Sequence, residues 1–331
     1  MKFATTASAF ALALSAASAF AADLPALKAP PPAAAVVPMW TGFYAGLNIG
    51  YGFGGSGSAA SNGWETYNQY ATAQLGPRSA TMTNAGNVGG LGFANTGTAS
   101  QNQSGVIGGG QIGYNLQYGK SFLVGLEADF QGAGIGGKGS FSGLGRNNVY
   151  HTYPTDPTKA SIWHSENAFA GTTNISSGLN WLGTLRGRLG YLVTPSLLVF
   201  GTGGLTYGGA YANVNSYGAT QYIPWAHLGH EPITMTSFFG NASASSVLVG
   251  WNAGGGLEWM FMQNWSAKAE AFYYDLGSMN LSGSGYQLAA NPTNNAAAYM
   301  SQTRVSYNGV IARAGVNYHF NWGSTPVIAS Y

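Results

Sequence analysis

From Trp40 onward, long stretches of the chain alternate between apolar residues and small or polar ones. In FYAGLNIGYGF, residues 43–53, every odd position is apolar and most even positions are glycine or asparagine. A period of two predicts β-strands with two different faces. Seven further segments of this kind begin near residues 105, 121, 179, 196, 246, 265 and 304. We therefore predict eight strands of about 12–17 residues, against roughly 5–6 in an average strand.

The connections between these strands are expected to alternate in length. YGKS, TPS and MQN join strands two and three, four and five, and six and seven. The other connections are long and rich in Gly, Ser, Asn and Thr, and they cover residues 55–104, 138–178, 215–245 and 282–303. This alternation is typical of an up-and-down barrel. The predicted fold is all-β: an eight-stranded antiparallel up-and-down transmembrane β-barrel with four long external loops and three short periplasmic turns. Further strands inside residues 55–104 remain an open alternative.

The distribution of charge separates a membrane barrel from a soluble β-sandwich. Only 7% of the residues are charged, against roughly 25% in a typical soluble domain. The apolar faces carry no Lys, Arg, Asp or Glu along their middle. The opposite faces carry mainly small residues, chiefly glycine and asparagine, and only a few charged residues. A sandwich would place many charged residues on its water-facing sides. The pattern therefore indicates strands that are apolar outside and polar inside.

Aromatic residues on the apolar faces are spaced as membrane belts would require. Trp181 and Tyr191 are ten residues apart on one face, which projects to about 25 Å along the axis of a tilted strand, the height of a lipid-facing band. The predicted aromatic girdle consists of Trp181, Tyr191, Trp251, Trp259, Trp265 and Tyr273.

The two ends of the chain differ from its middle. Residues 1–21 read as a secretory signal peptide, with Lys2 at the start and small residues at Ala19 and Ala21 before the expected cleavage site. An export signal is favoured over a single transmembrane helix. Residues 22–39 form a predicted Pro/Ala-rich periplasmic tether, residues 40–320 the barrel, and residues 321–331 a short periplasmic tail.

Three segments, ADLPALKAPP, WTGFYAGLNIGYGFGG and RAGVNYHFNW, resemble the small porin-like or opacity-protein-like outer-membrane barrels of rhizobia and related alphaproteobacteria. That family includes hemin-binding members. The resemblance implies an eight-stranded barrel, residence in the bacterial outer membrane and insertion by the barrel-assembly machinery. We also expect both termini to be periplasmic and the barrel to contact outer-membrane lipid and lipopolysaccharide. The resemblance also implies an insertion signal at Tyr318 and Phe320, although eleven residues follow Phe320 here.

With the apolar faces outside, four acids and four bases fall on the inward faces. They are Glu127, Asp129, Arg186, Arg188, Glu258, Lys268, Glu270 and Arg313. An eight-stranded barrel is just wide enough for side chains to fill it, and a buried ion is costly unless it is paired. We predict a plug in which the two strand-three acids face the two arginines, Glu258 faces Lys268, and Glu270 faces Arg313. A pore lining that selects ions is the alternative, and acid–base catalysis is disfavoured.

Few features indicate a ligand. Histidines His227 and His230 lie three apart in a predicted external loop beside Trp225, which makes them candidates for hemin or a metal, although solvated loop histidines are the simpler interpretation. No metal and no other cofactor is expected. The chain has no cysteine, so a Cys-ligated metal is excluded. Its net charge is only +2, so no nucleic-acid partner is expected.

The expected function is that of a non-enzymatic barrel that contributes to envelope integrity and presents its loops for surface contact, with the external partner unknown. A narrow porin-like channel for small solutes is one alternative, and hemin or host-surface binding by the loops is another. A serine hydrolase in the barrel wall is disfavoured, since the inward histidine His319 has no evident serine or acid partner in the sequence.

Overall fold

The computed structural model describes residues 40–68, 81–82, 90–152, 163–223, 234–287 and 297–320. The predicted signal peptide, the tether and the C-terminal tail lie outside these residues. So do the loop histidines His227 and His230.

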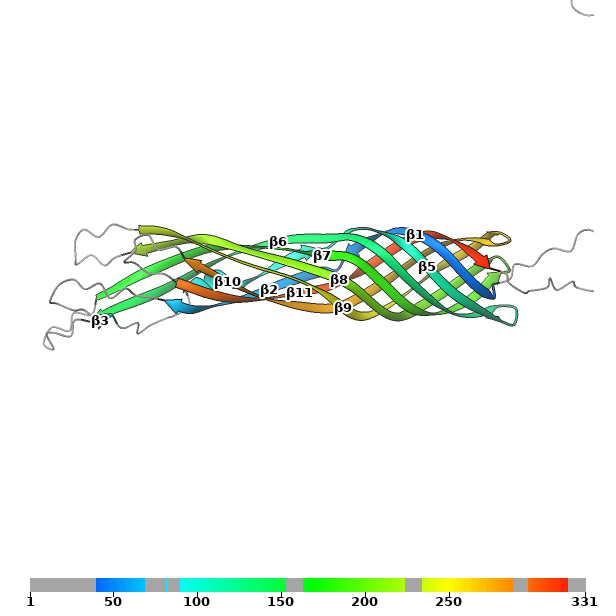
Figure 1. The fold of residues 1–331 in the computed structure, drawn as a ribbon, viewed down its shortest axis with the longest axis horizontal. Coiled ribbons are helices and arrows are strands. Elements are labelled where there is room, and N and C mark those ends of the chain that lie inside the picture. Colours follow the sequence, from blue (N-terminus) through cyan, green and yellow to red (C-terminus); the bar gives the residue numbers. More distant parts are fainter. Residues whose placement is uncertain are drawn as a thin grey trace, which may run out of the picture. The chain divides into compact units, whose positions relative to one another are not determined.

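The described chain is almost entirely β-strand (Figure 1). The elements are β1 (Gly42–Gly54), β2 (Ser56–Asn68), β3 (Thr81–Met82), α1 (Gly90–Ala94), β4 (Gly97–Asn102), β5 (Gly105–Tyr118), β6 (Phe122–Thr152), β7 (Trp163–Thr194), β8 (Leu197–Ile223), β9 (Thr234–Met262), β10 (Trp265–Gln287) and β11 (Ala297–Phe320).

Eight of these strands form a closed antiparallel ring. The order is β1-β5-β6-β7-β8-β9-β10-β11, and β11 pairs back onto β1, from Phe43 opposite Phe320 to Gly54 opposite Gly309. Short turns join β5 to β6, β7 to β8 and β9 to β10, all at one end of the barrel, which we call the turn end. The predicted up-and-down β-barrel is thereby confirmed.

The strands are much longer than predicted. β6 to β11 have 23 to 32 residues each, so most of residues 138–178, 215–245 and 282–303 is strand, and the prediction of long loops there was wrong. These stretches are rich in Gly, Ser and Asn, which have low β-propensity. Pairing with a long neighbour on each side overrides that local preference. For example, β7 pairs continuously with β8 from Glu166 opposite Ile223 to Leu179 opposite Ala210.

The open question of extra strands in residues 55–104 has a specific answer. β2 continues the line of β1 along β11, from Ala59 opposite Val305 to Asn68 opposite Ala297. β4 pairs with β2 and leads directly into β5. These segments therefore prolong two existing strand positions of the ring and do not widen it.

The polarity of the two faces of the barrel wall changes along the strands. Near the turn end, in what we call the membrane section, the outward residues are large and apolar, as in Phe122, Val124, Leu126 and Phe130 of β6. Further along, the outward residues become polar. On β6 to β11 they include Lys138, Ser140, Asn174, Ser176, Asn213, Asn215, Asn241, Ser243, Asn280, Ser282 and Gln302. We call this part the extension.

The lumen of the extension holds an apolar cluster together with neutral polar side chains such as Gln101, Thr173 and Ser177. Its inward residues include Ile135, Ile175, Val214, Leu281 and Val305, which belong to one buried cluster. On β7 the extension runs from Trp163 to Trp181, which projects to about 45 Å along the axis. The chain therefore builds a barrel whose outer face is apolar in one section and polar in the next, where an apolar cluster fills part of the lumen.

Helix α1 lies in the wall of the extension between β2 and β6. Added Cβ atoms at Gly63 and Gly145 would lie 2.6 Å and 1.8 Å from carbonyl oxygens of α1, so only glycine permits this close approach. The helix buries Leu91 and Ala94 against inward aromatic residues of β7, β9 and β11. Among the described residues, no helix is long and apolar enough to cross a membrane.

Candidate functional site

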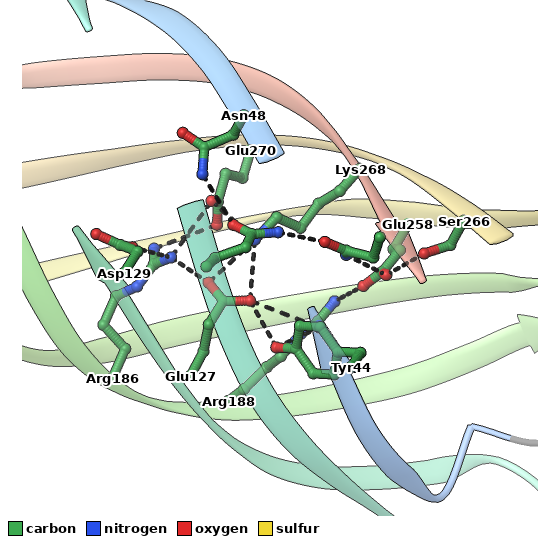
Figure 2. A network of polar contacts seen from close by, with 12 residues as sticks. Tyr44, Asn48, Glu127, Asp129, Arg186, Arg188, Glu258, Ser266, Lys268 and Glu270 are labelled. Atoms are coloured by element: carbon green, nitrogen blue, oxygen red, sulfur yellow. Dashed lines mark hydrogen bonds and ion pairs between the residues drawn. The ribbon is translucent and has the colours of Figure 1, made fainter. Parts of the chain in front are cut away.

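The lumen of the membrane section contains a network of charged side chains (Figure 2). All eight charged residues predicted for the interior lie there, and all are buried. They come from β6, β7, β9, β10 and β11, because the alternation of these strands turns every second side chain inward. Four carboxylates meet four cations, so the network is electrically balanced.

Glu127 on β6 is the centre of the network. Its carboxylate accepts hydrogen bonds from the Arg186 guanidinium, from Lys268 Nζ at 2.9 and 3.0 Å, and from the Tyr44 hydroxyl at 2.6 Å. Arg188 and Arg313 approach it at 4.0 and 3.8 Å. One carboxylate thus contacts all four cations.

Arg186 and Arg313 each bind two further carboxylates, those of Asp129 and Glu270. Arg186 donates to Glu270 Oε2 at 3.2 Å and to Asp129 Oδ2 at 3.2 Å. Arg313 donates to the same two carboxylates, at 2.5 and 2.7 Å. The guanidinium Cζ atoms of both arginines lie over the Phe272 ring, at 4.9 and 5.1 Å from its centroid. A guanidinium group has five N–H donors in a rigid plane, so one arginine can bind several carboxylates at once.

Arg188 forms the second half of the network with Glu258. Its guanidinium donates to Glu258 Oε2 and lies 3.8 Å over the Phe200 ring. The other Glu258 oxygen accepts from Asn317 Nδ2 at 2.7 Å and from Ser266 Oγ at 2.5 Å.

His319 therefore has the serine and acid neighbours that the sequence did not reveal. Ser266 Oγ lies 2.9 Å from His319 Nε2, and Glu258 Oε1 lies 3.4 Å from the same nitrogen. A catalytic triad needs its acid on the other ring nitrogen, where it orients the imidazole. Here the acid and the serine share one nitrogen, and Ser266 is fully buried.

One of the predicted pairings was wrong. Glu258 and Lys268 are opposite each other on β9 and β10, yet Glu258 pairs with Arg188 while Lys268 pairs with Glu127 and Glu270. In a narrow lumen, long side chains reach across as easily as they reach a strand neighbour. Register alone therefore does not determine the partners. The expected pairs Arg186 with Glu127 and Arg313 with Glu270 are present.

Sequence reasoning also missed the neutral members of the network. Gln111 Oε1 accepts from Lys268 Nζ at 2.8 Å, and Thr184 Oγ1 donates to Asp129 Oδ2 at 2.7 Å. Each stands at an inward position of its strand, which is the feature in the sequence that identifies it.

Apolar layers close the lumen on both sides of the network. Toward the turn end, Trp40 packs with Leu123, Leu192, Leu198, Phe200 and Met260. Trp40 is fully buried, it meets His319 edge to face at 5.6 Å, and its indole N–H donates to the Pro195 carbonyl at 2.9 Å. Toward the extension, Ile107, Leu182, Phe272, Tyr274 and Ile311 fill the lumen.

The six residues of the predicted aromatic girdle all point outward in the membrane section. Trp181 stacks on Phe130 at 5.5 Å, and Trp251 lies 5.5 Å from Tyr273. Nearer the turn end, Tyr191 meets Phe122 at 5.6 Å, Trp265 meets Tyr318 at 5.1 Å and Trp259 meets Phe261 at 6.0 Å.

The predicted insertion residues Tyr318 and Phe320 end the last strand. Their rings pack edge to face at 5.1 Å, and both lie on the outward face beside β1 and β10. Their role in insertion stays a prediction.

The candidate ligand site at His227 and His230 lies outside the described residues, and hemin binding stays a prediction. Within the residues that the structure describes, no group of three His, Asp or Glu side chains is placed to hold a metal ion.

No known protein-family description matches the chain. Two proteins named 31 kDa outer-membrane immunogenic protein, from Brucella melitensis and Brucella suis, are each 28% identical to it over 271 residues, which cover 81% of this chain and 85% of the relative. Among solved structures, OprG from Pseudomonas aeruginosa is 11% identical, with a TM-score of 0.31, and the match covers 86% of this chain and 99% of OprG. Ail of Yersinia pestis is 10% identical, with a TM-score of 0.24, and the match covers 82% and 99%.

The closed ring and its apolar outer band define a transmembrane β-barrel, and the sequence relatives are outer-membrane proteins. The chain is an outer-membrane β-barrel protein.

Proposed function

We propose that this protein is a closed, non-conducting barrel that contributes to envelope integrity and presents its extension for surface contact. The observation that carries this proposal is the filled lumen. An ion network lies between two apolar layers, and all three consist of fully or nearly fully buried side chains.

A narrow channel is the competing function, and the network argues against it. A permeating ion would have to separate Arg188 from Glu258, or Glu127 from its four cations, and breaking one buried pair costs about 3–5 kcal/mol. It would also have to cross the Trp40 layer and the Phe272 layer, which offer it little polar coordination. The balanced charge also gives the lumen no net preference for cations or anions.

Conductance measurements test this proposal directly. We expect the refolded full chain to insert into planar bilayers without stable single-channel steps, under conditions in which a general porin conducts. Reproducible steps of one size from the wild-type protein would contradict the closed barrel and favour the channel.

The same proposal requires the turn end to face the periplasm and the extension to project from the cell. The polar outer face of the extension suits water. The name of the Brucella relatives, an immunogenic protein of the outer membrane, fits a chain that is accessible at the surface. Both orientation and surface contact belong to the proposal.

Single cysteines can test the orientation, because the chain has none of its own. A membrane-impermeant maleimide is expected to label Ser243→Cys, on the outward face of β9, in intact cells. Gln263→Cys, in the β9–β10 turn, is expected to react only after the outer membrane is opened. The reverse labelling pattern would show the opposite orientation.

We also propose that the barrel is non-enzymatic. The grouping of Ser266, His319 and Glu258 is tied to Arg188 and Asn317 and lies buried behind Trp40. Its carboxylate is used to balance charge and accept hydrogen bonds, which suits a structural role.

A further inference from the structure

The outer wall of the extension has a hollow on β6, β7 and β8 that is lined by several polar side chains. Its volume is about 400 Å³, and it is lined by Lys138, Ser140, Asn174, Ser176 and Asn215 together with Gly139 and Ile175. The register explains this grouping. Lys138 is opposite Ser176, Ser140 is opposite Asn174, and Asn174 is opposite Asn215. Three neighbouring strands thus present one ammonium group and a set of hydroxyl and amide groups on the same face.

Tyr211 separates this hollow from the membrane section. Added Cβ atoms at Gly136 and Gly178 would lie 3.1 and 2.7 Å from the Tyr211 hydroxyl oxygen, so the side chain lies across these two glycines on the outer wall. The hollow opens beyond it, away from the membrane. A side chain at either glycine would displace Tyr211 and change this boundary of the hollow.

Lys138 is an exposed cation that has no nearby acid in the part of the chain that the structure describes. No described acidic oxygen lies within ion-pair distance of its Nζ, whereas Arg146, further along the same strand, pairs with Glu166 at 2.9 Å. The polar neighbours of Lys138 in the hollow are neutral donors and acceptors. Such a site suits a ligand that carries many hydroxyl groups and at least one negative charge.

A row of exposed aromatic side chains continues from the hollow. Tyr217 follows Asn215 on the same face of β8, Phe239 is opposite Tyr217, and Tyr286 is opposite Phe239. Their exposed fractions are 53%, 39% and 51%, and the Phe239 and Tyr286 rings meet at 4.4 Å. Exposed apolar groups in a contiguous row on a water-facing surface usually mark a binding surface.

The hollow and the row together have the chemistry of a saccharide site. Amides and hydroxyls can exchange hydrogen bonds with sugar hydroxyls, flat aromatic rings offer apolar faces to sugar C–H groups, and a lysine attracts a phosphate or carboxylate substituent. The height also fits. Ser176 is five residues beyond Trp181, which belongs to the part of the aromatic girdle that borders the extension. This separation projects to about 13 Å along the axis, where the headgroups of the outer leaflet would lie.

We infer that this surface, from Lys138 to Tyr286, binds the anionic saccharide headgroup of the glycolipid in the outer leaflet, that is, lipopolysaccharide of the same membrane. The inference rests on the proposed orientation, which places the extension outside the cell. It gives surface contact a specific partner: the wall holds the sugar layer around the barrel.

Titration calorimetry on the detergent-refolded full chain tests this inference. The probes are lipid-free core oligosaccharide from rough lipopolysaccharide, lipid A alone, and neutral dextran. We expect binding of the core oligosaccharide only. Lys138→Gln, and separately Tyr217→Ser with Tyr286→Ser, should each weaken it by about tenfold or more, the loss expected for one charge-assisted contact or a stacked pair.

The matched control is Lys120→Gln, which removes the same charge from an exposed position in the β5–β6 turn and should bind as the wild type does. Heat-modifiable migration on gels confirms that each variant is folded. The inference is overturned if the core oligosaccharide does not bind, if lipid A or dextran binds equally well, or if the variants in the hollow and the row match the wild type. Because this assay does not measure conductance, its failure would leave the closed barrel standing, and bilayer steps would leave the saccharide site standing.

Discussion

Replacing Arg186 and Arg188 together by methionine is expected to lower the free energy of unfolding of the barrel by more than the roughly 3–5 kcal/mol typical of breaking one buried pair. Methionine fills much of the space but leaves Glu127 and Glu258 without their strongest partners. Four carboxylates would then share Lys268 and Arg313. Denaturant unfolding of the refolded protein, followed by tryptophan fluorescence and by heat-modifiable migration, measures the loss.

Two further variants separate charge imbalance from lost packing. Arg188→Met combined with Glu258→Gln keeps the network balanced and leaves Ser266 and Asn317 an acceptor, so it should recover most of the stability lost in Arg188→Met alone. Arg146→Met, which breaks the exposed pair with Glu166, should cost at most about 1 kcal/mol. If the double arginine variant were as stable as the Arg146 variant, the network would not support the barrel.

An arginine placed on the outer wall should report where the membrane ends. Leu205→Arg on β8 puts a cation in the middle of the apolar band, where Leu205 is opposite Leu185 and Trp251. We expect it to destabilise the barrel by about 2–4 kcal/mol in lipid, as measured by denaturant unfolding in vesicles.

Asn213→Arg is the matched control on the same strand and the same face, further along in the extension. It should change the stability by less than about 0.5 kcal/mol, because a surface substitution in water is usually tolerated. Equal effects of the two variants would show that the bilayer does not stop between Tyr207 and Asn213, and the division of the wall into two sections would be wrong.

The alternation of residues predicted the membrane section well, and its physical reason is local. A strand in a lipid-facing wall must alternate between apolar and polar residues, so Phe43 to Phe53 and Val310 to Phe320 reveal both the strand and its outward face. The inward positions then follow without any knowledge of contacts, and the eight charged residues lie where that rule places them.

The partners within the network could be predicted only in part, because Arg186 with Glu127 and Arg313 with Glu270 are present but Glu258 with Lys268 is not. Lys268 and Glu258 are neighbours in register, yet Lys268 reaches Glu127 on the far side of the lumen at 2.9 Å. Which pairs form depends on the width of the lumen and on the length of each side chain. Both are properties of the closed ring.

The extension shows the clearest limit of sequence reasoning. Segments such as SFSGLGR and NISSGLN look like polar loops because they are rich in Ser, Asn and Gly and contain only a few scattered apolar residues. They are strands because each is paired along its length with a neighbour that is equally long, as β6 is with β7.

By itself, therefore, the sequence determined that the chain forms a barrel, which faces of its strands meet lipid, and that the charges inside must balance. Only the tertiary structure decided how far the barrel continues beyond the membrane, which ions meet across the lumen, and that Lys138 and Tyr286 share one surface. The reason is that contact with lipid requires apolar residues at every second position of each strand, so it can be read from the strand's own sequence. Pairing between strands depends on residues far apart in the chain and produces no such local pattern.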